Sequence, residues 1–401
     1  MNNWKEYHIK DLGTVITGNT PPTTQREYYG NEYKFIKPTD MIEGQRFVDS
    51  TEECLSDLGY QKYKKSLLPK FTPCVVTIGS LGKKMCLTDC ECFTNQAVNA
   101  VIPNKNNDGI FLYYAFKATV LAYVKQLDSG TSSGRENVSK SSFSNIKITV
   151  PPLPTQQKIA GILSKYDEAI ENNNKRIKLL EQMAQNLYKE WFVRFRFPGW
   201  QNAEFENGIP KGWEYINLFD VVDVTYGYAF ASELFCDDKT LNPVVRIRDI
   251  LDNHTNTFTS ESCTDKYIIK ENEILIGMDG IFHMCMWNGE KAYQNQRVVK
   301  LTSKTDKISN YFVFLAVQPQ IKFWEQTIAG TTVAHLGDKH LKRMSILIPS
   351  EEILKPATVK FNLLMKQKNF LFKQTQNLSR QRDLLLPRLM SGKLQVLLDT
   401  Q

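Results

Sequence analysis

Three cysteines lie close together in the sequence, and neighbouring thiolates can bind zinc. They are Cys86, Cys90 and Cys92, and their spacing is not one that recurs in zinc sites. We interpret them as buried strand cysteines. The five histidines, at positions 8, 254, 283, 335 and 340, have no second ligand residue at metal spacing. We therefore expect no metal site, and the unpaired spacing of all eight cysteines indicates reduced cytosolic thiols.

Motifs for phosphate binding and methyl transfer are incomplete. The segment GSLGKKM (79–85) lacks both the glycine spacing of a phosphate loop and the hydroxyl after its lysine. NTPPT (19–23) comes nearest to the Asn/Asp-Pro-Pro-aromatic tetrad of an amino-methyltransferase but lacks the aromatic residue. There is no glycine pattern for S-adenosylmethionine or dinucleotides after a strand, and no nucleophile elbow. These residues predict a binding protein without catalysis of its own.

An internal repeat organises the chain. WKEYHIKDLGTVITG, which begins at Trp4, aligns with WEYINLFDVVDVTYG, which begins at Trp213, at an offset of 209 residues. FIKPTDM (35–41) aligns with VRIRDI (245–250), so that a base is followed three residues later by an acid in both copies. Further matches follow in the same order: Ile78-Gly79 with Ile276-Gly277, Asn95-Gln96 with Asn295-Gln296, and Val150-Pro151 with Ile348-Pro349. Such ordered matches predict a true duplication.

Each copy has two parts. Its first 150 residues or so alternate short apolar runs with Gly, Pro and Asn, which predicts strands and turns. One helix-like stretch lies inside each copy, at 111–127 and at 311–326. A long helix is then expected in each copy. In the first copy, the run from Thr155 to Phe197 contains no proline and only one glycine, Gly161.

The first long helix has a heptad pattern typical of coiled coils. Its apolar positions are Leu163, Tyr166, Ile170, Ile177, Leu180, Ala184, Leu187 and Trp191. Asn173 fills the remaining position, either as a device that fixes register or as a solvated residue at a frayed seam. In the second copy, leucines recur at 364, 371, 378 and 385, flanked by Leu363, Phe370, Asn377 and Leu384. We expect Pro387 to end that helix.

The expected fold class is α+β. Two repeated, mixed α/β globular recognition domains are separated by two long antiparallel helices that form a coiled coil, because neither helix is expected to be stable with its apolar stripe exposed. The expected boundaries are 1–152 for the first domain, 153–196 for the first helix, 197–349 for the second domain and 350–401 for the second helix.

The net charge of +7 is concentrated in the long helices. Residues 351–393 contribute +6 and residues 155–196 contribute +3, which leaves −2 for the remainder of the chain. The domains therefore do not act through bulk positive charge, and solvated helix faces account for part of the excess. No stretch approaches the roughly 20 apolar residues of a membrane helix, and the N-terminal residues lack the apolar core of a signal peptide. The expected location is the cytoplasm, without a membrane partner.

The chain resembles the specificity (S) subunits of type I restriction-modification systems. VPPLPTQQKIAGIL (150–163) is similar to the family's junction between domain and helix, and GIPKGWE (208–214) to the opening of a recognition domain. LLPRLMSGKL (385–394) resembles the end of the second helix, and TGNTPP (17–22) and YGYAF (226–230) resemble first-loop signatures. The first copy lacks the Gly-x-Pro-x-Gly before its Trp, and the second junction reads IPSEEILKP without the expected Gln.

The resemblance implies a division of labour. Each domain would read one half of a split site in double-stranded DNA, and the helices would set the gap between the halves. The helices would also dock methyltransferase (M) subunits, two per chain, and restriction (R) subunits would join through them. The chain itself would bind no cofactor, with S-adenosylmethionine, ATP and Mg expected on partner subunits.

Polar and basic residues near expected turns are the candidates for DNA contacts, because arginine and similar side chains can read base edges. They are Lys37, Thr39, Ser80, Lys83, Lys84 and Arg135 in the first copy, and Arg246, Arg248, Arg297 and His335 in the second. For each, a solvated surface position is the alternative. Asn95-Gln96 and Asn295-Gln296 occur in both copies, which favours a shared structural role.

Two other functions remain open from the sequence. The −2 balance of the domains is compatible with a protein-interaction scaffold that binds no DNA. A type I-like recognition subunit could also serve another defence system or a solitary methyltransferase, because that difference would lie in neighbouring genes.

Overall fold

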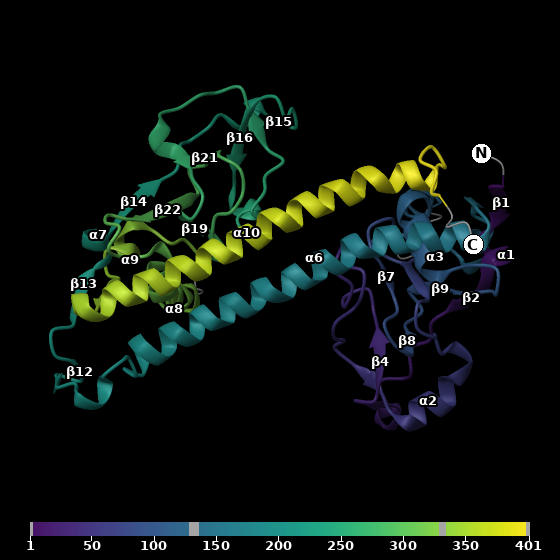
Figure 1. Cartoon of the computed structure of the whole chain (residues 1–401), viewed down its shortest axis with the longest axis horizontal. Helices are drawn as coiled ribbons and strands as arrows, with labels where there is room; N and C mark the ends of the chain where they lie inside the picture. Colours follow the sequence, from purple (N-terminus) through teal and green to yellow (C-terminus); the bar gives the residue numbers. More distant parts are fainter. Residues whose placement is uncertain (1–2, 128–135, 329–333, 398–401) are drawn as a thin grey trace. The chain divides into compact units, whose positions relative to one another are not determined.

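The computed structural model describes residues 3–127, 136–328 and 334–397. The chain divides into two compact units, one formed by Met1–Asn172 with Thr375–Gln401 and the other by Asn173–Gln374. Two long helices, α6 (Leu153–Tyr188) and α10 (Glu351–Met390), each contribute a segment to both units (Figure 1). The remainder of each unit is a globular domain, called domain 1 in unit 1 and domain 2 in unit 2.

Domain 1 contains a two-stranded sheet, β1-β10, and two four-stranded sheets with the orders β2-β9-β6-β7 and β3-β5-β4-β8. The strands are β1 (Lys5–His8), β2 (Gly13–Thr17), β3 (Tyr29–Gly30), β4 (Tyr33–Ile36), β5 (Cys54–Leu55), β6 (Pro73–Val76), β7 (Met85–Leu87), β8 (Cys92–Thr94), β9 (Val98–Pro103) and β10 (Lys147–Val150). The helices are α1 (Ile9–Leu12), α2 (Asp57–Tyr63), α3 (Gly109–Ala115), α4 (Leu121–Gln126) and α5 (Lys140–Ser144), with a π-helical turn at Phe116–Val120 joining α3 to α4.

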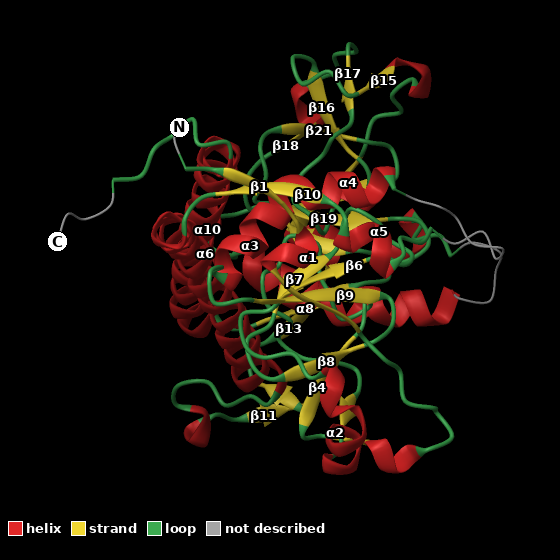
Figure 2. Ribbon diagram, turned by 90° about the vertical axis from the view of Figure 1, so that its right-hand side faces the viewer, coloured by secondary structure: helices red, strands yellow, loops and turns green. Residues whose placement is uncertain are grey.

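Domain 2 repeats this arrangement with the sheets β13-β23, β14-β22-β19-β20 and β15-β17-β16-β21-β18, and a small hairpin β11-β12 precedes them. The strands are β11 (Phe205–Glu206), β12 (Ile209–Pro210), β13 (Glu214–Asn217), β14 (Val222–Tyr226), β15 (Phe235–Cys236), β16 (Asn242–Val245), β17 (Phe258–Thr259), β18 (Ile268–Ile269), β19 (Ile274–Gly277), β20 (Met284–Met286), β21 (Ala292–Gln294), β22 (Val298–Ser303) and β23 (Ser345–Ile348). The helices are α7 (Leu218–Val221), α8 (Asn310–Ile328) and α9 (Asp338–Leu341). Each domain combines mostly antiparallel strands with a few helices, yellow and red in Figure 2, which confirms the predicted α+β class.

The strand registers confirm the duplication. Gly13 lies opposite Pro103 in the β2–β9 pair, and Val222 lies opposite Ser303 in the β14–β22 pair. Strand β14 therefore follows β2 at an offset of 209 residues, and β22 follows β9 at an offset of 200, as in the aligned sequences. Gly18 and its counterpart Gly227 have the same packing, because a Cβ at either position would collide with the backbone of the turn at Asn95 or Asn295.

One segment of the sequence alignment is wrong. The sequence pairs Ile78-Gly79 with Ile276-Gly277, but Ile276 and Gly277 lie within strand β19. Ile78 forms a β-bridge with Asn137, and in domain 2 the equivalent bridge joins Asp279 to His335. Gly79 therefore corresponds to Gly280, and both have positive φ angles, of 90° and 70°. The error arose because a two-residue Ile-Gly match is too short to fix the position of a gap.

Each long helix is part of the core of the domain that it touches. In unit 1, Ile159 and Leu163 of α6 and Leu389 of α10 are buried in one cluster with Phe111 and Phe116 of domain 1. In unit 2, Ala184 of α6 and Phe361 of α10 are buried with Phe312 of domain 2. The helices are thus stabilised by burial against their domains as well as against each other.

The heptad seam is confirmed in α6. All nine of its positions, including Asn173, are buried or half-buried. Within unit 2, the Asn173 Nδ2 donates to Gln374 Oε1 at 3.1 Å, and Glu181 forms an ion pair with Lys368 at 2.8 Å. These two pairs show that the helix segments run antiparallel. The amide of Asn173 is therefore a buried inter-helix partner and not a solvated group at a frayed seam.

Pro387 does not end α10, contrary to the sequence expectation. The helix continues to Met390, and Gly392 follows with a φ of 67°. A proline costs one backbone hydrogen bond, which the last turn of a packed helix tolerates, whereas a glycine in the left-handed region terminates it. Among the described helices, none is long and apolar enough to cross a membrane.

The cysteine interpretation holds for two of three residues. Cys86 in β7 and Cys92 in β8 are buried, whereas Cys90 is exposed on the turn between these strands. Burial raises the pKa of the Cys92 thiol well above its ordinary value. Cys90 is exposed because it lies between Asp89 and Glu91, in a polar turn that short-range sequence spacing did not reveal.

Candidate nucleic-acid interface

The repeated base-x-x-acid motif forms the same turn in both domains. The Lys37 N–H donates to Asp40 Oδ2 at 2.7 Å, and the Arg246 N–H donates to Asp249 Oδ2 at 2.9 Å. The carboxylate therefore replaces a backbone acceptor and fixes the turn. The acid of the motif has a structural role, and only the basic side chain remains available for binding.

The two basic side chains of this turn have different surroundings. Lys37 Nζ lies 2.8 Å from Glu52 Oε2 and 3.3 Å from Glu53 Oε2, and the bond to Glu52 raises the pKa of Lys37. The Arg246 guanidinium carbon lies 5.4 Å from the centre of the Phe235 ring. Lys37 is thus neutralised by two carboxylates, whereas Arg246 is stacked against an aromatic face.

Domain 1 brings most of its candidate residues to two adjoining loops. Thr39 is exposed on the Lys37 turn, and Ser80 and Lys83 are exposed on the loop between β6 and β7. Lys84 Nζ donates to the Pro38 carbonyl at 2.8 Å, which joins the two loops. Arg135 lies outside the described residues.

In domain 2, two of the candidates converge on one carboxylate. His335 Nδ1 lies 2.6 Å from Asp279 Oδ1, and Arg297 Nε lies 3.3 Å from Asp279 Oδ2. Arg248 is separate from this cluster, and its Nη2 donates to Thr257 Oγ1 at 3.0 Å. Asp279 was not among the sequence candidates, although its place before Gly280 in a turn after a strand was a signal for an exposed loop.

The asparagine of each repeated Asn-Gln pair stabilises the backbone. The Asn95 N–H donates to the Ile36 carbonyl at 3.2 Å, and the Asn295 N–H donates to the Val245 carbonyl at 3.1 Å. Each asparagine carbonyl also closes the next turn, by accepting from the N–H of Val98 or Val298. Equivalent bonds in two domains support the predicted shared structural role.

A model of one protein family matches both copies. The model for the type I restriction modification DNA specificity domain matches residues 1–182 and 210–373. The chain belongs to this family. A scaffold function without DNA, which the nearly neutral domains left open, is not favoured by this match.

Curated specificity subunits are similar to this chain over all or part of its length. The type I restriction enzyme MjaIX specificity subunit of Methanocaldococcus jannaschii is 28% identical, with 98% of this chain and 94% of that protein covered. The EcoBI specificity subunit of Escherichia coli is 30% identical over 48% of this chain and 42% of that protein. The S subunit structure from M. genitalium has a TM-score of 0.63 at 18% identity, with 96% of both chains covered, and supports the fold.

The junction motif of the first specificity domain has a clear structural role. The side chain of Gln156 is buried at the start of α6, where its Oε1 accepts from the Asp108 N–H at 2.9 Å. Its Nε2 donates to the Pro151 carbonyl at 2.8 Å and to Asn107 Oδ1 at 3.1 Å. Gln156 therefore attaches the helix to a loop of the specificity domain. The junction of the second specificity domain lacks this residue but has Thr358, whose hydroxyl donates to the Lys307 carbonyl at 2.7 Å.

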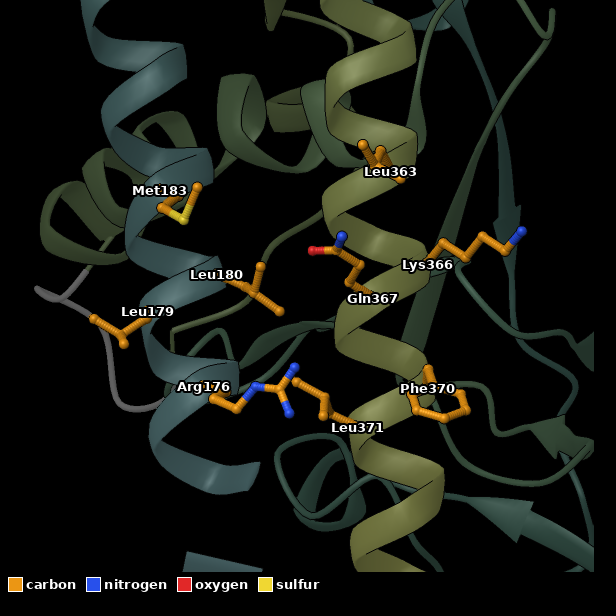
Figure 3. Close-up of a pocket in the computed structure, with 9 residues that line it drawn as sticks. All are labelled: Arg176, Leu179, Leu180, Met183, Leu363, Lys366, Gln367, Phe370 and Leu371. Atoms are coloured by element: carbon orange, nitrogen blue, oxygen red, sulfur yellow. The ribbon is translucent and has the colours of Figure 1, made fainter. Parts of the chain in front are cut away.

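An apolar groove lies between the segments of α6 and α10 that pack against domain 2. It has a volume of about 510 Å³. Its exposed apolar side chains come from both helices: Leu179 and Met183 from α6, and Leu363 and Phe370 from α10. Figure 3 shows Leu180, Gln367 and Leu371 pointing into the space between the helices. Arg176 and Lys366 add positive charge to the lining.

Proposed function

We propose that this chain is the DNA-recognition subunit of a type I restriction-modification enzyme. Each specificity domain reads one half of a bipartite site in double-stranded DNA. The observation that carries the proposal is the duplicated scaffold: two domains with matching strand registers present different side chains on equivalent loops. A single protein with two such reading surfaces suits a target made of two different half-sites.

The long helices are proposed to set the gap between the half-sites and to dock methyltransferase subunits. The groove lined by Leu179, Met183, Leu363 and Phe370 supports docking, because exposed apolar patches on soluble proteins commonly mark interaction surfaces. Two methyltransferase subunits per chain are expected from the repeat, with restriction subunits joining through them. S-adenosylmethionine, ATP and Mg are proposed to bind these partners, and the chain alone is proposed to catalyse no reaction.

Methylation mapping tests the function. The chain is combined with its cognate methyltransferase subunit and S-adenosylmethionine on a plasmid library of random sequence, and the methylated adenines are then sequenced. One motif with two fixed half-sites and an unspecific gap of constant length is expected. The chain without the methyltransferase subunit serves as the control and should leave the library unmodified. A complex that methylates without sequence preference, or methylation by the isolated chain, would contradict the proposal.

A further inference from the structure

Three backbone positions occupy the same hydrogen-bonded frame in both specificity domains. In domain 1, the Thr77 N–H donates to the Ala97 carbonyl at 2.8 Å, and in domain 2 the Met278 N–H donates to the Arg297 carbonyl at 3.0 Å. The bridge from Ile78 to Asn137 likewise corresponds to the bridge from Asp279 to His335. We call these the triplet positions, occupied by Ile78, Ala97 and Asn137 in domain 1 and by Asp279, Arg297 and His335 in domain 2.

The triplet positions combine a constant backbone with variable side chains. Further frame bonds are shared, since the Val138 N–H donates to Thr77 and the Leu336 N–H donates to Met278, at 2.9 and 2.8 Å. The side chains at the triplet positions nevertheless differ in size, charge and polarity between the two domains. Residues required for folding would tend to be alike in both copies, as Gly18 and Gly227 are. Different side chains on one frame are the arrangement needed to read different bases.

The geometry in domain 2 prepares Arg297 for a directional contact. Asp279 Oδ2 lies beside its Nε at 3.3 Å, and the Arg297 side chain is 54% exposed. Within the described part of the chain, no hydrogen bond occupies the two Nη atoms of Arg297. These two Nη groups are donors in a fixed plane, and a bidentate contact with the O6 and N7 atoms of guanine uses donors of this kind. His335 lies beside the other oxygen of the same carboxylate, and its side chain is 47% exposed.

We propose that Arg297 reads a guanine in the half-site recognised by domain 2, and that Asp279 is the positioning residue that orients its guanidinium. This inference rests on the proposed function, because it requires that domain 2 contact DNA bases. The contact is direct readout in the major groove, where guanine presents two acceptors on one edge. A lysine would keep the charge but lose the planar pair of donors.

The experiment compares R297A, R297K and D279N in the complete complex with the methyltransferase subunit. Methylated adenines are sequenced from the random plasmid library. The wild-type complex should require guanine at one position of one half-site. In R297A and R297K, the preference for guanine at that position should fall by roughly tenfold to a hundredfold. D279N should relax the same position to a smaller degree, and D279E should restore part of the preference.

A matched control is available in the same domain. Lys342 is 63% exposed and forms an ion pair with Asp338, much as Arg297 does with Asp279. K342A should leave the motif unchanged. Arg297 and Lys342 are exposed and Asp279 is partly exposed, and complex formation with the methyltransferase subunit checks that each variant is folded.

Three results would overturn the inference. R297A could lower methylation of all sequences equally while R297K restores it, which would identify Arg297 as a phosphate contact. Relaxation at several positions, or in both half-sites, would indicate a general loss of structure. An unchanged motif in R297A would show that Arg297 reads no base. Failure of the proposed function is distinguishable, because the wild-type complex itself would then lack a bipartite motif.

Discussion

Asp167 and Arg382 are opposite charges buried together in unit 1, in contact with domain 1. Their side chains are 5% and 11% exposed, and Arg382 Nη1 lies 2.5 Å from Asp167 Oδ1. The Tyr114 hydroxyl donates to the other carboxylate oxygen at 2.5 Å. Burial opposes the charge on Arg382, but Asp167 outweighs this effect and raises the pKa of the guanidinium. The charge on Arg382 is therefore stabilised by its buried partner Asp167.

Removal of Arg382 alone should destabilise unit 1 strongly. R382M leaves Asp167 buried without its counter-charge, and we expect a loss of about 3–5 kcal/mol in the free energy of unfolding, measured by urea denaturation. The matched control is K368M, two heptads earlier on the same helix. The partner of Lys368, Glu181, is 41% exposed, so a loss of about 1 kcal/mol or less is expected there. Equal losses in the two variants would refute this account.

The sequence predicted some residues of the candidate nucleic-acid interface by type and missed others. The base-x-x-acid motif was found in both copies, but its acid proved to be a turn acceptor, because the same residue types suit binding and capping alike. Asp279 was missed since an aspartate before a glycine in a turn is common and most such residues are solvated. Arg297 and His335 lie 38 residues apart in the sequence, and only the fold brings them to one carboxylate.

At the scale of single elements, the apolar periodicity of α10 predicted only one of the two rows of residues that face inward along this helix. The leucines at 364, 371, 378 and 385 are buried or half-buried as predicted. The second buried row includes Lys368, Thr375 and Arg382, which counting apolar residues cannot detect. Their charges are accommodated by acids on α6, with Glu181 beside Lys368 and Asp167 beside Arg382. The flanking row of Leu363, Phe370, Asn377 and Leu384 is exposed instead.

The repeat offset shows that the groove has no apolar counterpart elsewhere in the helices. At the repeat offset of 198 residues, Leu363 of α10 corresponds to Lys165 of α6, and Phe370 corresponds to Asn172. Leu179 likewise corresponds to Asn377. Two docking faces built on the two copies would therefore differ in chemistry, and the apolar one should bind more tightly because it buries more apolar surface.

A charge placed in the groove should remove one methyltransferase subunit. Phe370 is 66% exposed, so F370D should leave folding intact while burying a carboxylate in any docked interface. We expect at least tenfold weaker binding of one subunit, seen in native mass spectrometry as a fall from two subunits per chain to one. V359D is the control, since Val359 is 63% exposed on the same helix and lies outside the groove. Full occupancy in F370D would rule out the groove as a docking surface.

At the scale of the whole molecule, the duplication was the most reliable prediction from sequence. The sequence offsets of 209, 200 and 198 residues recur between equivalent strand pairs of the two domains. Gly13 pairs with Pro103, and Val222 with Ser303, at offsets of 209 and 200. Lys5 pairs with Val150, and Glu214 with Ile348, at offsets of 209 and 198. A strand pair that occurs in both domains fixes the offset of each of its two strands, whereas a sequence match of two residues fixes neither. Among the described residues, the alignment failed at the loop after β6, where the number of residues between anchors changes.

The two long helices lend themselves to a test of the proposed gap function. An inserted heptad keeps the buried rows in phase and adds about 10 Å to a helix, at about 1.5 Å per residue. That length is about 3 base pairs, which also turn one half-site by about 100° around the DNA. Three heptads add about 32 Å, or roughly 9 base pairs, and leave a mismatch of only about 40° from a full turn.

We therefore expect methylation to fall and recover as the inserted length increases, with the period of one turn of DNA. One heptad in each helix, next to Asn173 and Gln374, should nearly abolish methylation, because a domain would meet the wrong side of the duplex. Three heptads in each helix should restore it on sites whose gap is about 9 or 10 base pairs longer, with both half-sites unchanged. Sequencing of methylated adenines from a library with varied gaps decides the matter. An unchanged gap in the three-heptad variant, or altered half-site bases, would show that the helices do not set the spacing.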